Sequence, residues 1–151
     1  MTETYSLTLS RIFDAPPAVV FDAWVHPPHI RRWYPSVPDA AGTEAVVDLR
    51  PGRSYRISWL GDDGSRYTEA GEFIEVQPPG RLVYTMRFED AFSDQFESRV
   101  PAVFSGDGGG TRLELTHEGY PSAETRDAHE QGWPSFLDRL ASLVVSLRSP
   151  R

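Results

Sequence analysis

The stretch SAETRDAHEQGWPSFLDRLASLVVSLRSPR, residues 122–151, decides the fold of this chain. Its apolar side chains recur every three or four residues, the spacing that places them on one face of an α-helix. They are Trp133, Phe136, Leu137, Leu140, Leu143, Val144 and Leu147. Gly132 and Pro134 should either kink this helix or mark where its regular, buried portion begins. The stretch predicts a long amphipathic helix that needs an apolar partner surface.

The chain before this helix, from about residue 43 to 119, contains only strand and turn patterns. Glycine and proline favour tight reversals at residues 51–53, 61–65, 77–81 and 105–110. The segments between the reversals are EAVVDL, SYRISWL, YTEAGEFIEV, LVYTMRF, FESRVPAVF and TRLELTHE. Residues 5–13 alternate apolar and polar side chains, which brings the predicted strands to about seven. Pro101 lacks an N–H inside its strand, so we expect a sheet edge or a bulge there.

Two short helices are predicted between the first strand and the others. Residues 16–25 begin with a proline suited to a first helical turn and carry a cluster of apolar side chains. Pro27 and Pro28 should end this helix, and a second short helix should carry Ile30 and Trp33.

The order of these elements predicts an α+β fold in a single domain spanning residues 1–151. A strongly curved antiparallel sheet of about seven strands leaves a concave apolar face, and the long C-terminal helix is the element left to cover it. A helix laid across such a face leaves space at one end unless large side chains fill it. We therefore expect a cavity between the sheet and the helix.

Composition limits the partners of the chain. The 15 basic residues, all arginine, stand against 22 acidic ones and give a net charge of −7. That charge repels phosphate backbones, so we expect no nucleic-acid partner. The absence of cysteine excludes disulfides and thiol chemistry. The N-terminus lacks an export signal pattern and no apolar run has the length of a membrane span, so we expect a cytoplasmic protein without a membrane partner.

Strand alternation indicates which side chains face the cavity. Tyr55 and Trp59 share one face of their strand, and Tyr84 and Met86 share one face of theirs. If Ile74 and Val76 are buried, Glu72 also points inward, unless the register slips. The predicted ligand-binding residues are Trp33, Tyr55, Trp59, Glu72, Tyr84, Met86, His117 and Trp133.

Glu72 and His117 are the polar candidates in this apolar set, and two interpretations of them remain open. A desolvated carboxylate beside an imidazole could act as general acid and base, because burial moves both pKa values toward neutrality. Alternatively, Glu72 pairs with Arg87 or Arg99, and His117 lies at the sheet rim bonded to backbone.

Other motifs give no support to a cofactor or a metal. His26 and His29 are separated by two prolines, and His129 lacks the second histidine of a zinc-protease helix. Gly108–Gly110 lead into a predicted strand without the lysine of a phosphate-binding loop. No Gly-x-Ser-x-Gly elbow occurs, so a serine hydrolase is not predicted. We expect no metal and no cofactor.

Several ordered motifs resemble a known family over about residues 5–147. They are RIFDAPPAVVFDAWVHPPHIRRWYP, DLRPGRSYRISW, DDGS, GEFIEVQPPGRLVYT, GGGTRLELTHEGY and HEQGWPSFLDRL. Together they resemble the activator of heat-shock-protein ATPase homologue-like (AHSA-type) family of the SRPBCC, or START-like, superfamily. The resemblance implies a helix-grip fold with a deep cavity between the sheet and the long helix, but no catalytic motif. Pro101 and Pro134 depart from the family pattern and bear on the shape of the cavity.

Three functions follow from these expectations. The leading hypothesis is a binding protein, not an enzyme, for a small hydrophobic molecule that is aromatic, lipid or polyketide-like. The first alternative is a polyketide cyclase or dehydratase-like enzyme that uses the same cavity. The second alternative is a chaperone-cofactor-like interaction module, for which we expect a filled interior. The oligomeric state is left open between monomer and homodimer.

Overall fold

The computed structural model describes residues 4–34, 43–61, 64–89 and 96–147. The strands are β1 (Tyr5–Phe13), β2 (Glu44–Val47), β3 (Ser54–Leu60), β4 (Arg66–Gln77), β5 (Arg81–Phe88), β6 (Ser98–Asp107) and β7 (Gly110–Tyr120). The helices are α1 (Pro17–Val25), α2 (Pro27–Trp33) and α3 (Ala123–Leu147). The predicted α+β class, the strand number and the long C-terminal helix are confirmed.

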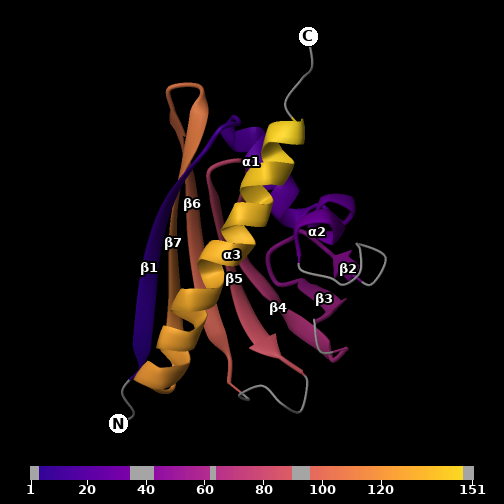
Figure 1. Ribbon diagram of the computed structural model, residues 1–151, viewed down its shortest axis with the longest axis vertical. Helices are drawn as coiled ribbons and strands as arrows, with labels where there is room; N and C mark the ends of the chain where they lie inside the picture. The colour runs from indigo at the N-terminus through magenta and orange to yellow at the C-terminus, as the bar shows by residue number, and fades with distance from the viewer. Residues whose placement is uncertain (1–3, 35–42, 62–63, 90–95, 148–151) are drawn as a thin grey trace.

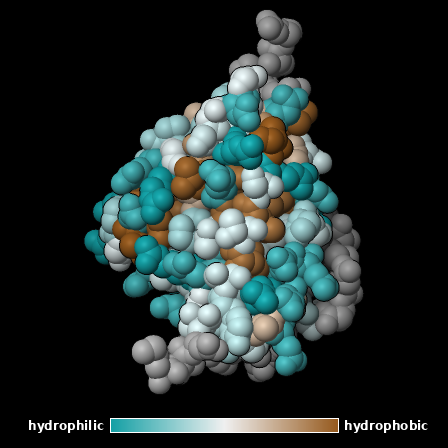
Figure 2. All heavy atoms as spheres, turned by 90° about the vertical axis from the view of Figure 1, so that its left-hand side faces the viewer, coloured by the Kyte–Doolittle hydropathy of each residue, from teal (hydrophilic) through white to brown (hydrophobic). Residues whose placement is uncertain are grey.

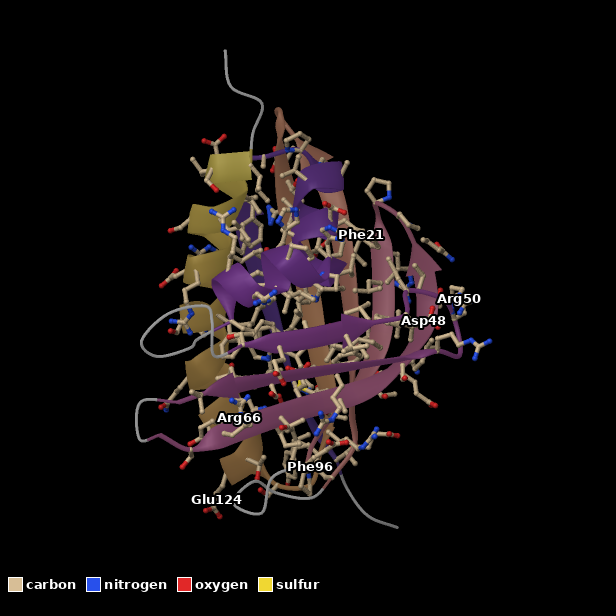
Figure 3. The ribbon with its side chains drawn as sticks, turned by 90° about the vertical axis from the view of Figure 1, so that its right-hand side faces the viewer. Phe21, Asp48, Arg50, Arg66, Phe96 and Glu124 are labelled. Carbon is tan, nitrogen blue, oxygen red and sulfur yellow. The ribbon has the colours of Figure 1, made fainter. Side chains whose placement is uncertain are left out.

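The seven strands form one antiparallel sheet in the order β1-β7-β6-β5-β4-β3-β2. Each strand from β2 to β7 pairs with its neighbour in sequence, and β1 closes the order by pairing with β7. The long helix α3 crosses one face of the sheet (Figure 1). Seen from the side, β2 and β3 run across the direction of β6 and β7, so the sheet curves around its helical face (Figure 3).

The buried face of α3 lies in its second half. Leu137, Leu140, Leu143 and Val144 are buried, and all of them follow Pro134. The helix is continuous over Gly132 and Pro134, so Pro134 marks the start of the buried portion, which is one of the two alternatives that the sequence allows. Burying each of these side chains contributes about 1.5–3 kcal/mol. The first half of α3, before Pro134, has no buried side chain.

Helix α3 is also joined to the sheet by a polar contact. Arg11 of β1 lies 2.7 Å from Asp138 of α3, with side chains 31% and 68% exposed. An ion pair that is this exposed contributes about 0–1 kcal/mol. On the β1 side, hydrophobic side chains gather across the middle of the surface, with hydrophilic side chains around them (Figure 2). At the opposite edge, Asp48 and Arg50 form a 2.7 Å ion pair between β2 and β3 (Figure 3).

Pro27 and Pro28 act as the sequence predicts, whereas Pro101 does not. Pro27 and Pro28 do end α1, but they also form the first turn of α2, where a missing N–H costs nothing. Pro101 was expected at a sheet edge or a bulge, and this is wrong because β6 lies between β5 and β7. Pairing with β7 is recorded at Arg99 and again at Ala102 in the same register, so the proline falls where that ladder is interrupted.

The predicted inward orientation of Glu72 is also wrong. The pairing of β4 with β5 shifts between Phe73 and Glu75, which is a β-bulge. An extra residue reverses the alternation, so Phe73 before the bulge and Val76 after it both pack against the core. Glu72 is therefore exposed, and Glu69 is the buried carboxylate of β4 at 3% exposure.

Within the described residues, no helix has the length and apolar character needed to cross a membrane.

Candidate functional site

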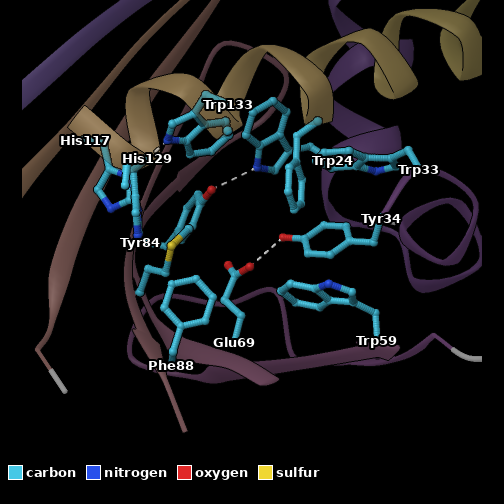
Figure 4. Close-up of a pocket in the computed structure, with 14 residues that line it drawn as sticks. Trp24, Trp33, Tyr34, Trp59, Glu69, Tyr84, Phe88, His117, His129 and Trp133 are labelled. Carbon is cyan, nitrogen blue, oxygen red and sulfur yellow. Dashed lines mark hydrogen bonds between the residues drawn. The ribbon is translucent and has the colours of Figure 1, made fainter. Parts of the chain in front are cut away.

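A pocket of about 180 Å³ lies between the first half of α3, the two short helices and strands β3 to β5 (Figure 4). It is lined by Trp24, Trp33, Tyr34, Trp59, Glu69, Tyr84, Met86, Phe88, His117, Ala128, His129, Gly132, Trp133 and Phe136. The volume is similar to that of an engineered cavity of about 150 Å³ that binds benzene. The space matches one or two small rings.

Aromatic rings from the three helices and from strands β3 and β5 form the walls. Trp24 of α1 stacks on Trp133 of α3 with ring centroids 6.2 Å apart and 22° between the planes. Tyr34, which follows α2, meets Trp59 of β3 edge to face at 5.2 Å. The Trp33 indole N–H donates to the carbonyl of Ala23 at 2.9 Å, which fixes α2 against α1. The walls are therefore positioned by packing and hydrogen bonds before any ligand binds.

Glu69 supplies a buried carboxyl group to this pocket. Tyr34 donates a hydrogen bond to Oε1 at 2.8 Å, and the Tyr55 hydroxyl lies 2.8 Å from Oε2. Burial raises the pKa of Glu69 to about 7, because desolvation outweighs the opposing effect of these two hydroxyls. In Figure 4 the carboxyl group points from β4 toward Tyr34, between the rings of Tyr84 and Trp59.

The number of available protons around Tyr55 also favours a protonated Glu69. The Tyr55 hydroxyl lies 2.9 Å from the carbonyl oxygen of Thr85 as well as 2.8 Å from Glu69 Oε2. A tyrosine has one hydroxyl hydrogen, so it cannot donate to both oxygens. If Glu69 is protonated, its hydrogen goes to Tyr55 and the Tyr55 hydrogen goes to Thr85. The contacts are then all satisfied without a buried charge.

Gly71 allows this arrangement. A Cβ at this position would lie 1.9 Å from the carbonyl oxygen of Thr85, far inside contact distance. The Thr85 side chain also accepts the backbone N–H of Glu72 at 2.9 Å. A glycine is thus required for the Thr85 peptide to approach β4 and present its carbonyl to Tyr55.

Tyr84 of β5 presents a second polar group to the pocket. Its hydroxyl accepts the indole N–H of Trp24 at 3.3 Å. Burial first, and the nearby Glu69 second, raise the pKa of Tyr84, so the hydroxyl keeps its hydrogen. Among the residues that the structure describes, no acceptor is recorded for that hydrogen. It is available to a bound molecule.

His117 of β7 is completely buried and bonded through both ring nitrogens. Trp133 donates its indole N–H to Nδ1 at 3.1 Å, and Ser98 Oγ lies 2.7 Å from Nε2. The Tyr120 hydroxyl lies 2.6 Å from Nδ1 of His117 and 3.1 Å from Nδ1 of His129. Desolvation, followed by the neighbouring His129, lowers the pKa of His117 to about 3. The imidazole is neutral and linked to side chains, rather than to backbone at the rim.

The structure brings most of the predicted site residues together. Trp33, Trp59, Tyr84, Met86, His117 and Trp133 line the pocket, and Tyr55 lies behind Glu69. Glu72 does not reach it. The expected partners of Glu72 are occupied elsewhere, since Arg87 lies 3.6 Å from Glu89 and Arg99 lies 3.7 Å from Glu118.

The predicted ligand-binding residues did not include Trp24, Tyr34, Phe88, His129 and Phe136, although strand alternation had placed Phe88 on the cavity face, and Glu69 was predicted to point outward. Glu69 shares its strand face with Gly71 and Phe73, and a large aromatic residue in that set was the available signal for the inward face. His29 lies 3.4 Å from Asp22, but the described ranges contain no group of three or more potential metal-ligating side chains.

The model of the family "Activator of Hsp90 ATPase homolog 1-like protein" matches residues 14–145. This chain belongs to that family. The resemblance inferred from its motifs is confirmed, and so is the helix-grip arrangement of sheet and long helix. No curated protein matches the chain.

Solved structures of similar proteins share the architecture of this AHSA1-like chain. Protein CV1439 from Chromobacterium violaceum is 28% identical, with a TM-score of 0.78 over 92% of this chain and 96% of its own. A protein from Rhizobium leguminosarum is 26% identical, with a TM-score of 0.78 over 95% and 96%. CalU16 from Micromonospora echinospora is 27% identical, with a TM-score of 0.70 over 93% and 76%.

Proposed function

We propose that this AHSA1-like protein binds a small, mostly apolar molecule of one or two rings in the pocket beside α3. The observation that carries the proposal is the wall of aromatic side chains around about 180 Å³ of space. Sites for small molecules combine such a lining with a few well-placed polar groups. Here those groups are Glu69 and Tyr84.

The size of the pocket narrows the ligand class. Pockets for drug-sized molecules have volumes of about 300–1,000 Å³. The pocket of about 180 Å³ is smaller, so a benzene- or indole-sized molecule matches it better than a lipid chain or a full polyketide. Aromatic ligands can also pair with the wall rings at about 0.5–1.5 kcal/mol beyond the area they bury.

The test is a thermal-shift series with toluene, phenol, indole and naphthalene, followed by nuclear magnetic resonance of the tryptophan indole N–H signals. A ligand at about 100 times its Kd stabilises the folded state by about 2.7 kcal/mol and raises Tm accordingly. The signals of Trp24 and Trp133 should shift, because both rings line the pocket. A series in which neither Tm nor these signals move would reject the proposal. Decane serves as a chain-shaped control.

A second function, acid–base catalysis on the bound molecule, is favoured by one specific observation. Glu69 is a buried carboxyl group with a pKa raised to about 7, as general acids and bases require. It takes the place that was predicted for Glu72. His117 is a weaker candidate because both of its ring nitrogens bond to side chains.

Dehydration of 4-hydroxy-4-phenylbutan-2-one tests this second function. Removal of the proton next to the carbonyl group and loss of water would give a conjugated enone, which is followed by its ultraviolet absorbance. Turnover that is lost in Glu69→Gln and kept in Glu72→Gln would support catalysis. Binding without turnover would support the binding function and not catalysis.

The third function, a chaperone-cofactor-like module, carried the expectation of a filled interior, and the pocket favours a small molecule instead.

A further inference from the structure

We infer that the molecule bound in the pocket is an organic cation, held by aromatic faces and by Glu69 as its counter-ion, and that its binding releases the proton of Glu69. The inference rests on the proposed function and names the ligand class of the same site. It follows from three properties of the pocket, which are its aromatic walls, its single carboxyl group and the absence of an arginine from its described lining.

The walls have the composition of a cation-binding cage. Tryptophan and tyrosine rings attract a cation placed over their faces, and the attraction grows when the site is desolvated. Trp24, Tyr34, Trp59 and Tyr84 line the pocket and are each at most 9% exposed. They come from separate elements and surround the Glu69 carboxyl group (Figure 4). A compact ammonium group could contact several of these faces at once.

Glu69 lacks the partner that a buried carboxylate needs. Among the residues that the structure describes, its two oxygens contact only the hydroxyls of Tyr34 and Tyr55. An unpaired charge at 3% exposure is unfavourable, so Glu69 is protonated unless a cation is bound beside it. A bound cation would supply the missing charge partner. The carboxyl group would then ionise, and its proton would leave for solvent.

Other titratable groups around Glu69 do not replace such a partner. Tyr34 follows α2, Tyr55 is in β3 and Tyr84 is in β5; burial raises the pKa of all three, so they remain neutral. Across the pocket, His117 of β7 is neutral and His129 of α3 bonds to Tyr120.

Arg139 of α3 contacts two lining residues but is not part of the lining. Arg139 donates to the carbonyl of Trp33 at 3.2 Å and lies over the Phe136 ring at 5.5 Å. It is absent from the described lining, which contains no arginine. An anionic ligand would therefore meet a carboxyl group and no guanidinium group in this lining, so the pocket disfavours it.

Phenyltrimethylammonium and tert-butylbenzene form a matched probe pair, because they have the same shape and differ in one charge. The quaternary cation carries no ionisable proton, so any proton released on binding comes from the protein. Isothermal titration calorimetry in two buffers of different ionisation enthalpy counts that proton. We expect the cation to bind at least about tenfold more tightly than its neutral isostere at about pH 8.

Proton release and pH dependence should follow the ionisation of Glu69. Binding of the cation should release about one proton near pH 6 and almost none near pH 8. As the pH is raised toward about 7, the affinity for the cation should increase up to about tenfold per pH unit, and above about pH 7 it should level off. The affinity of tert-butylbenzene should change less than about twofold over the same range.

Glu69→Gln is the diagnostic variant, since glutamine has the shape of the protonated acid. The variant should bind phenyltrimethylammonium at least about tenfold more weakly and should release no proton on binding it. Its affinity for tert-butylbenzene should stay within about twofold of the natural value. Glu72→Gln changes an exposed carboxylate on the same strand and should alter none of these values. If Glu69→Gln fails to fold, the probe pair and the proton count on the natural chain still decide.

The outcomes separate the two proposals. Binding of tert-butylbenzene with no preference for the cation overturns the inference and leaves the proposed binding function standing. Cation binding without proton release, unchanged in Glu69→Gln, also overturns the role of Glu69. If neither probe binds and the ring series produces no shift, both the function and the inference fall.

Discussion

The indole nitrogen of Trp133 lies 3.1 Å from Nδ1 of His117 and joins the long helix to the last strand. An indole N–H is only a donor, so Nδ1 accepts and Nε2 carries the hydrogen. Ser98 Oγ lies 2.7 Å from Nε2, and its own hydroxyl donates to the carbonyl of Met86 at 3.1 Å. One directed chain of hydrogen bonds therefore runs from α3 through β7 to β5.

This chain of hydrogen bonds sets the tautomer of His117. Nitrogen chemical shifts of the labelled protein at neutral pH should show His117 with its proton on Nε2. Trp133→Phe keeps an aromatic ring but removes the donor, so the Nδ1 signal should move while Ser98 remains in place. A proton found on Nδ1 in the natural protein would contradict these hydrogen-bond directions.

The low pKa of His117 has a consequence for acid stability. Its folded-state pKa is about 3 and its ordinary value is 6.5, so folding favours the neutral ring. Because the folded-state pKa is lowered, the neutral ring stabilises the fold above about pH 6.5, and this stabilisation is lost as the pH falls toward about 3. Against His117→Gln, the free energy of unfolding of the natural chain should decline by about 4 kcal/mol more across this window. If the free energies of unfolding from urea denaturation change with pH equally in the two proteins, the pKa of His117 is not lowered in the folded state.

Glu69 has the opposite dependence on pH. Its pKa is raised from 4.5 to about 7, so folding favours the protonated acid. The stabilisation is complete below about pH 4.5 and is lost as the pH rises to about 7, a total of about 3 kcal/mol. The stability difference between the natural chain and Glu69→Gln should therefore fall through that range in urea unfolding. A difference that is constant or grows with pH would show that Glu69 is ionised in the folded state.

Tyr55→Phe tests the proton arrangement around that acid. The variant loses the contact with Glu69 and leaves the carbonyl of Thr85 without its hydroxyl donor. We expect about 1–3 kcal/mol of lost stability from the unpaired buried carbonyl. When Glu69 ionises, the Tyr55 hydroxyl can turn to donate to the carboxylate, which lowers the pKa of Glu69, so this pKa should rise further in the variant. Carboxyl carbon shifts measure that pKa, and Tyr5→Phe on β1 is the control that should leave it unchanged.

Gly71→Ala should weaken the fold, since the new Cβ would lie 1.9 Å from the Thr85 carbonyl oxygen. Such overpacking costs about 1–3 kcal/mol when the backbone must move. Gly132→Ala in α3 is the matched control because nothing lies within 4 Å of its added Cβ. That variant should gain about 0.5–1 kcal/mol from helix propensity. Equal Tm changes for the two alanines would show that Thr85 does not approach Gly71 closely.

Alternation and helical spacing were sufficient to predict the frame of the molecule. In β3 the side chains of Tyr55, Ile57 and Trp59 all face the core, because the strand pairs regularly with both neighbours. The apolar face of α3 after Pro134 also follows its spacing. Where pairing is regular, a two-residue or 3.6-residue period carries directly into the structure.

Prediction failed where pairing is irregular. The bulge in β4 is a shift in its pairing with β5 between Phe73 and Glu75, so it depends on residues from two strands. Counting along a single strand could not locate it, so Glu72 and Glu69 were exchanged. The hydrogen bonds of Glu69 to Tyr34 and Tyr55 were equally invisible, since three separate elements supply their atoms. The fold was readable from local patterns, whereas the chemistry of the pocket depends on tertiary contacts.

The close approach of the Thr85 peptide to Gly71 makes the buried acid recognisable in other chains. The sequence signature is a glutamate followed two residues later by a glycine, together with tyrosines equivalent to Tyr34 and Tyr55. These four positions lie in three separate segments of the chain. A relative that keeps the glutamate but carries alanine in place of the glycine could not place the carbonyl in the same way. Sorting AHSA1-like sequences by these four positions would separate those able to share this pocket chemistry from those that share the scaffold alone.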